Sequence, residues 1–148
     1  MKKNPTESYT MTFIGLHALI HNSEGKILII QRCETNRYKP LMWDVPGGKK
    51  QTGESVLEGL QREVFEETGL KITSVIKPLS VFANTTQVPV REDVQIVFLC
   101  TVEDADAEIV LDQTEHRSYE WIDPADLRKY DIMAYLACYC DTVENCGD

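Results

Sequence analysis

Residues 48–70 read GKKQTGESVLEGLQREVFEETGL, and the rest of the chain is organised around this stretch. Its apolar residues recur with the period of an amphipathic helix, so we predict a helix over residues 54–68 that ends at Gly69. Either Thr52 or Ser55 can cap the N-terminus of this helix. The face that we expect to turn toward a core carries Leu57, Leu60 and Val64.

Three acidic residues lie beside that apolar face. Glu63, Glu66 and Glu67 fall within about a third of the helix circumference, where they repel one another at pH 7. A hard divalent cation, which prefers oxygen ligands, would relieve this repulsion. Arg62 is within one helical turn of Glu58 and Glu66 and can hold a carboxylate in a bidentate contact. A solvated helix face would show the same charges, so the acids alone do not establish a site.

The spacing of the whole stretch is more specific than its acids. It contains Gly, five residues, Glu, seven residues, Arg-Glu, an aliphatic residue, one residue, Glu-Glu, one residue, Gly and an aliphatic residue. This pattern resembles the Nudix box, and the sequence WDVPGG at residues 43–48 resembles the MutT-related branch of that family. Every defined position of the box is matched, by Gly48, Glu54, Arg62, Glu63, Val64, Glu66, Glu67, Gly69 and Leu70.

The resemblance implies both a fold and a reaction. The fold is an α/β/α sandwich, with a mixed central sheet, the box helix on one side and further helices from the C-terminal part of the chain. The reaction is the hydrolysis of a diphosphate linkage in a nucleoside diphosphate joined to another group, and it depends on Mg²⁺, with Mn²⁺ as a substitute. The implied metal ligands are the carbonyl of Gly48 and the carboxylates of Glu63, Glu66 and Glu67.

The residue that removes a proton from the attacking water stays open between two positions. Family members use either a glutamate of the box or an acid on a later loop, so the candidates are Glu63 and Glu115, with Glu92 a weaker third. Arg62 belongs to the same catalytic group, in which we expect it to organise the loop and the helix together with Glu54.

The substrate class is predicted by excluding branches of the family whose characteristic residues this chain lacks. The proline that usually follows the box in the ADP-ribose branch is replaced by Thr85, and residues 86–88 lack the tyrosine of the dinucleoside polyphosphate branch. A nucleoside or deoxynucleoside triphosphate, cleaved to the monophosphate and pyrophosphate, is the leading prediction. The alternatives are an ADP-sugar or dinucleotide pyrophosphatase, and a non-catalytic domain that senses a nucleotide, although such domains usually lose box carboxylates.

Positive charge collects just before the box in an otherwise acidic protein. The net charge is −9, but residues 26–50 hold six basic and two acidic residues. We predict that Arg37, Lys39 and Lys49 bind substrate phosphates, against the alternative that they are ordinary surface residues. Trp43 and Tyr38 are candidates to stack on a nucleobase, although for Trp43 packing against the sheet is the favoured interpretation.

The length of the chain, 148 residues, fits one domain. The negative charge argues against duplex nucleic acid as a partner and favours a small nucleotide. No apolar run approaches the roughly 20 residues of a membrane span, and residues 1–13 lack the apolar core of a signal peptide, so we expect a cytoplasmic protein. Five cysteines, an odd number, favour free thiols. A homodimer is left open, and we expect about six N-terminal and seven C-terminal residues to be mobile.

The remaining elements follow from turn residues and apolar runs. We expect a hairpin of strands 9–21 and 26–32, whose four consecutive apolar residues are buried on both sides. Further strands are expected at 43–45, 70–85 with a break at Pro78, 94–102, 109–111 and 119–122. Loops are expected at 86–93 and 112–118, and helices at 125–130 and 132–141, capped by Asp123 and Asp131.

Overall fold

The computed structural model describes residues 11–87 and 90–143. The strands are β1 (Met11–Ile20), β2 (Ile27–Arg32), β3 (Trp43–Asp44), β4 (Gly47–Lys49), β5 (Ile72–Gln87), β6 (Val90–Val102) and β7 (His116–Ile122). The helices are α1 (Val56–Thr68), the 3₁₀ helix η1 (Pro124–Lys129) and α2 (Ala134–Thr142). One sheet has the order β4-β1-β6-β5 with β1 parallel to β6, and a second, antiparallel sheet has the order β3-β2-β7.

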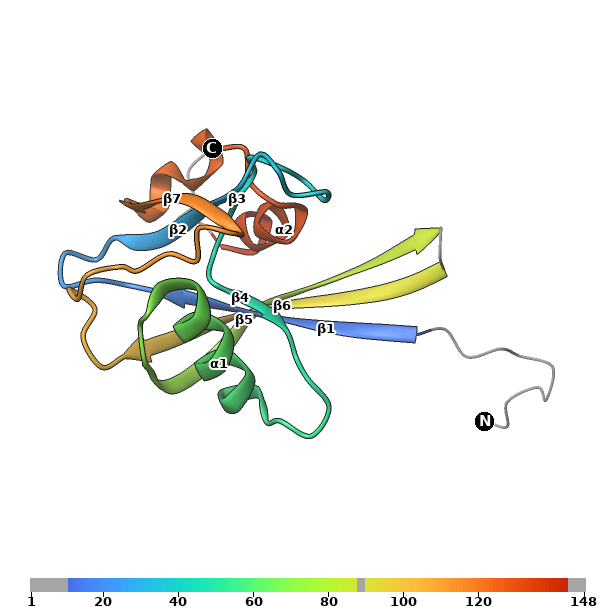
Figure 1. The fold of residues 1–148 in the computed structure, drawn as a ribbon, viewed down its shortest axis with the longest axis horizontal. Helices are drawn as coiled ribbons and strands as arrows, with labels where there is room; N and C mark the ends of the chain where they lie inside the picture. The colour runs from blue at the N-terminus through green and yellow to red at the C-terminus, as the bar shows by residue number, and fades with distance from the viewer. Residues whose placement is uncertain (1–10, 88–89, 144–148) are drawn as a thin grey trace.

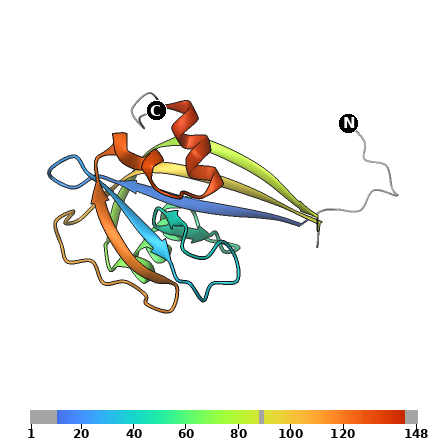
Figure 2. The same ribbon diagram turned by 90° about the horizontal axis from the view of Figure 1, so that it is seen from above.

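The helices cover opposite sides of these strands (Figures 1 and 2). Because side chains alternate along a strand, β1 and β2 each contribute to two apolar cores. The core beneath α1 combines Leu16, Ala18, Ile20 and Leu28 with Leu60 and Val64 of the helix. The core beneath α2 contains Leu19, Ile27 and Ile29 together with Tyr135 and Leu136. The predicted mixed α/β/α architecture is therefore confirmed, as is the burial of residues 27–30 on both faces.

Helix α1 begins and ends as its sequence dictates. Ser55 is the N-cap and forms a reciprocal capping box with Glu58. Gly69 ends the helix with a φ of 78°, a conformation that glycine adopts without strain. The expectation that Leu57 faces the core is wrong, since its side chain is 37% exposed. Leu57 stands in the first turn of α1, one turn before Leu60, the first of the helix's leucines in the core cluster.

The longest departure from expectation is at residues 86–93, predicted to be a loop. Strand β5 continues to Gln87 and β6 starts at Val90, so only two residues, which lie outside the described part, separate the strands. The polar start of β6 stays extended because it pairs with β5 on one side and with β1 on the other. Strand β5 also passes Pro78 without ending, because the register shifts between Pro78 and Ser80. The result is a long hairpin that extends away from the body beside β1 (Figures 1 and 2).

The expected hairpin of β1 and β2 is also corrected. Its turn forms, with the side chain of Asn22 accepting the N–H groups of Glu24 and Lys26. The two strands then separate into different sheets, and only an isolated bridge between His21 and Ile27 joins them. Strand β1 pairs with β4 and β6, and strand β2 pairs with β3 and β7.

Four smaller expectations change in the last third of the chain. Residues 109–111 form no strand, because Val110 donates its N–H to Thr68 at the end of α1 instead of to a sheet. Strand β7 starts at His116, inside the predicted loop 112–118. The helix predicted over residues 125–130 is the 3₁₀ helix η1, and Asp123 makes no side-chain cap there. Helix α2 starts at Ala134, with Met133 and not Asp131 at its N-cap.

Some expectations fall outside the described residues or remain untested. The terminal segments expected to be mobile lie mostly in residues 1–10 and 144–148, which the structure does not describe. Within residues 11–87 and 90–143, the helices are too short or too polar to span a bilayer. The thiols of Cys33, Cys100 and Cys138 are free.

Candidate active site

Arg62 is the centre of a network on the outer flank of α1. Its guanidinium donates to both carboxylate oxygens of Glu54, at 2.7 and 3.0 Å, and to Oε1 of Glu63 at 2.7 Å. It also donates to the carbonyl of Lys49 at 3.0 Å and lies 3.6 Å from Oε2 of Glu66. This arrangement ties the loop before α1 to the acids on the helix, and the Arg62 contact lowers the pKa of Glu54 to about 2.

Glu63 lies directly against the backbone of β4. A Cβ atom added to Gly48 would overlap the carboxyl group of Glu63, so any other residue there would require the Glu63 side chain to move. The neighbouring N–H of Gly47 donates to Oε2 of Glu67 at 3.2 Å. Glu63 and Glu67 are therefore held against strand β4, while Glu66 is exposed.

One guanidinium, that of Arg62, is shared among Glu54, Glu63 and Glu66, while Glu67 accepts the backbone N–H of Gly47. Burial raises the pKa of Glu67 well above its ordinary value, and the nearby carboxyl group of Asp44 raises it further. Burial also raises the pKa of Glu63, although the contact with Arg62 opposes the shift. A divalent cation would offset the cost of ionising these groups, so the residues present fit such an ion. Those that could hold it are Glu63, Glu66, Glu67 and the carbonyl of Gly48.

Asp44 and His17 form a buried pair behind the acids. Burial raises the pKa of Asp44 to about 7 and lowers the pKa of His17 to about 4. Nε2 of His17 donates a hydrogen bond to Oε1 of Gln95 at 2.6 Å, and the ring stacks on Tyr135, with centroids 3.9 Å apart. Arg32 lies 3.9 Å from Asp44, which is too far for a hydrogen bond. Sequence reasoning missed Asp44, because an acid beside a tryptophan in a short strand gives no sign of burial.

The turn before β7 completes the cluster from the other side. The carbonyl of Glu115 accepts the N–H of Cys33 and the side-chain amide of Asn36, both at 2.9 Å. Its own side chain is exposed. One ligand atom each of Glu115, Glu67 and His116 lie within 4.8 Å of one another. The structure therefore brings the later-loop candidate to the box acids, whereas Glu92 lies on β6 between Thr12 and Thr85, outside this cluster.

His116 is a residue that sequence reasoning missed. Its side chain is only 2% exposed, and neither ring nitrogen has a hydrogen-bond partner among the described residues. Burial lowers its pKa to about 4. In the sequence, only its position next to Glu115 pointed to a role for His116, and a residue in the loop expected at 112–118 gave no sign of burial.

The residues predicted to bind substrate lie around the acidic cluster and not within it. Trp43 is half-buried and meets Tyr130 edge to face, with centroids 5.2 Å apart, which matches the packing alternative. Arg37 and Lys39 are exposed in the loop before β3. Lys49 is exposed on β4, and its ammonium group lies over the ring of Phe13. Their roles in substrate binding remain predictions.

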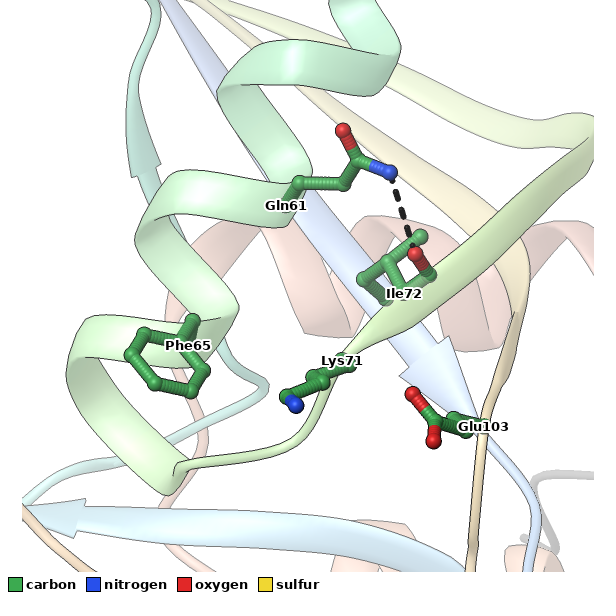
Figure 3. A pocket seen from close by; sticks show the side chains of 5 residues that line it. All are labelled: Gln61, Phe65, Lys71, Ile72 and Glu103. Atoms are coloured by element: carbon green, nitrogen blue, oxygen red, sulfur yellow. Dashed lines mark hydrogen bonds between the residues drawn. The ribbon is translucent and has the colours of Figure 1, made fainter.

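A separate pocket lies on the other flank of α1 (Figure 3). It is lined by Gln61, Phe65, Lys71, Ile72 and Glu103, and Gln61 donates to the carbonyl of Ile72 at 3.1 Å. Its lining includes none of the box acids that the structure describes. We therefore place the candidate active site on the acidic flank and not in this pocket.

Comparisons with known proteins show the family to which the chain belongs. The model of the NUDIX domain family matches residues 11–138. Over 113 residues the chain is 32% identical to the "Putative 8-oxo-dGTP diphosphatase" of Bacillus subtilis (strain 168), covering 76% of this chain and 68% of that protein. The solved structure of a MutT protein from Methanosarcina mazei Go1 superposes with a TM-score of 0.77 at 28% identity, covering 91% of this chain and 94% of that one.

The chain also matches part of a longer protein. It is 32% identical over 134 residues to Nudix hydrolase 6 of Arabidopsis thaliana, an alignment that covers 86% of this chain and 47% of that protein. The chain thus spans about half the length of this relative. It belongs to the NUDIX domain family and is a MutT-related Nudix hydrolase. The resemblance seen in residues 43–70 is confirmed.

Proposed function

We propose that this protein hydrolyses a nucleoside or deoxynucleoside triphosphate to the monophosphate and pyrophosphate, with Mg²⁺ or Mn²⁺ as cofactor. The observation that carries the proposal is the gathering of Glu63 and Glu67 against Gly47 and Gly48, with Glu115 reaching the same cluster. A domain that only sensed nucleotides would not need to keep these buried acids. The name of the Bacillus relative, "Putative 8-oxo-dGTP diphosphatase", supports a triphosphate substrate.

The residues of the site have different proposed roles in the reaction. A bound divalent cation would neutralise phosphate charge and acidify a water molecule. Glu63, Glu66, Glu67 and the carbonyl of Gly48 would hold that ion. Arg62 positions Glu63 through its 2.7 Å hydrogen bond while it anchors the loop through Glu54.

One proton must leave the attacking water as the new phosphorus–oxygen bond forms and the bond to the leaving phosphate breaks. Glu63 and Glu115 are the candidate bases. The raised pKa of Glu63 brings this carboxyl group closer to the value that suits a base at neutral pH. Glu115 is the more mobile candidate, because its side chain is exposed while its backbone is held.

Charge supports a small nucleotide and not a duplex as the partner. The protein carries a net charge of −9, and residues 26–50, which lead into the box, hold six basic residues that could guide a small polyanion and two acidic residues. Three free thiols fit the reducing cytoplasm that we propose as its location. We keep a single domain over residues 1–148 and a homodimer as further proposals.

The experiment is a substrate panel with the purified protein. Nucleoside and deoxynucleoside triphosphates, ADP-ribose and dinucleoside polyphosphates are incubated with Mg²⁺ or Mn²⁺, and the products are identified by chromatography. We expect a monophosphate and pyrophosphate from at least one triphosphate, and complete loss of product with EDTA. Cleavage of ADP-ribose alone would replace the substrate proposed. Calorimetric binding of a nucleotide without any product would favour the sensing domain.

A further inference from the structure

His116 occupies an unusual position for a buried histidine. It is the first residue of β7 and pairs with Arg32 of β2, and its side chain turns inward. Buried polar groups in proteins nearly always have a hydrogen-bond partner, yet both ring nitrogens of His116 lack one among the described residues. For comparison, the other deeply buried histidine, His17, satisfies one nitrogen through Gln95. The imidazole of His116 therefore has a lone pair available for a ligand.

The groups around that imidazole are suited to a cation. Ligand atoms of Glu67, Glu115 and His116 lie within 4.8 Å of one another. Two donors around one ion stand at most about 4.2 Å apart, since each lies about 2.1 Å from it. The exposed side chain of Glu115 can close the remaining gap by a small rotation, because packing does not hold it.

Local charge also favours a cation at this point. Glu67 interacts electrostatically with three like-charged groups, Asp44, Glu63 and Glu115, while His116 interacts with the guanidinium of Arg32. A bound divalent ion would turn the repulsion among these carboxylates into attraction. An imidazole nitrogen beside two carboxylates binds first-row transition metals better than it binds Mg²⁺, which prefers oxygen.

We propose that His116 and Glu115 join Glu67, one of the acids expected to hold the cation, in a mixed nitrogen and oxygen site for a divalent transition-metal ion, beside the other expected ligands Gly48, Glu63 and Glu66. This inference deepens the proposed function, since it rests on cations being held along α1, but it concerns which ion is bound and by which atoms. It makes the turn before β7 a ligand-bearing segment of the cation site.

The test uses Mn²⁺ alone as the probe and requires no turnover. The metal-free full-length protein is titrated with Mn²⁺, and the bound ion is examined by electron spin echo envelope modulation. We expect a ¹⁴N coupling in the wild-type protein that changes to a ¹⁵N coupling when histidine is labelled with ¹⁵N. In His116→Gln the nitrogen coupling should vanish, and the affinity for Mn²⁺ should fall about tenfold or more. His21→Gln is the matched control and should keep both, because His21 is exposed and stands outside the cluster.

Bound Mn²⁺ without any histidine nitrogen coupling in the wild-type protein would overturn the proposal, as would an unchanged coupling in His116→Gln. The labelled wild-type protein still shows whether a histidine nitrogen binds the ion if His116→Gln does not fold. Hydrolysis of a triphosphate with Mg²⁺ is measured separately. Hydrolysis without nitrogen coupling would reject this inference alone, and nitrogen coupling without hydrolysis of any substrate would reject the proposed function alone.

Discussion

The two sides of the candidate site are built differently. On the α1 side, Arg62 bonds two acids and a backbone carbonyl, and Glu63 is wedged against Gly48. On the β7 side, the backbone of Glu115 is held by three hydrogen bonds while its carboxylate is exposed. The carboxylate of Glu63 is therefore fixed by its side-chain contacts, whereas Glu115 is held through its main chain.

The difference indicates separate tasks. A carboxylate locked before substrate arrives loses little conformational entropy on binding a cation, which suits the groups that define where the ion sits. A carboxylate free to rotate can adjust as charge moves during the reaction. We therefore expect substitutions on the α1 side to have larger effects on activity than matched substitutions on the β7 side.

The largest effect should come from replacing the fixed acid. Glu63→Gln removes a proposed cation ligand and candidate base without changing side-chain volume, and we expect kcat to fall about a thousandfold. Glu115→Gln should lower kcat by about tenfold to a hundredfold, with KM nearly unchanged in both. Steady-state kinetics on the triphosphate found in the panel provides the measurement. Glu103→Gln, on the opposite flank of α1, makes the same charge change and should leave kcat unaltered.

A greater loss from Glu115→Gln than from Glu63→Gln would reverse the comparison and make the later loop the source of the base. If neither variant lowers kcat by more than tenfold, both residues have been assigned wrongly.

A smaller effect is expected from crowding the α1 side without removing an acid. Gly48→Ala places a methyl group where the carboxyl group of Glu63 lies, so Glu63 must move. We expect kcat to fall about tenfold to a hundredfold and the melting temperature to drop by a few degrees. Combining Gly48→Ala with Glu63→Gln should cost kcat little more than Glu63→Gln alone, because both changes disturb one contact. Fully multiplicative losses would show that Gly48 acts independently of Glu63.

The smallest effect should come from the basic segment before the box. Changing Arg37, Lys39, Lys49 and Lys50 together to glutamine should raise KM about threefold to tenfold at low salt, with kcat within twofold. The increase should shrink as ionic strength rises, since screening weakens attraction between the exposed charges and the phosphates. Lys71→Gln, on the far flank of α1, is the control. An unchanged KM would show that these residues are ordinary surface charges.

Local sequence accounted for the α1 side because all of its parts lie within 23 residues. The helix period placed the acids together, Ser55 and Gly69 set the ends, and Gly48 was identified through the spacing of the box. The strands with strong apolar alternation or continuous apolar runs, β1, β2 and the centre of β6, were predicted for the same reason.

Sequence reasoning failed where pairing between distant segments overrode local preference. Residues 86–93 are polar, yet they are largely strand because β1 and β5 offer backbone partners on both sides. Residues 109–111 are apolar, yet they do not form a strand, because the N–H of Val110 donates to the carbonyl of Thr68 at the end of α1.

The sequence by itself determined the family, the box helix and the set of acids along one flank of it, since these depend on spacing within one short segment. Only the tertiary structure decided that Asp44 is buried near Glu67 and that His116, some fifty residues further along the chain, points at the same carboxylate. Burial and proximity depend on how separate strands pair, and a one-dimensional pattern carries little information about that pairing.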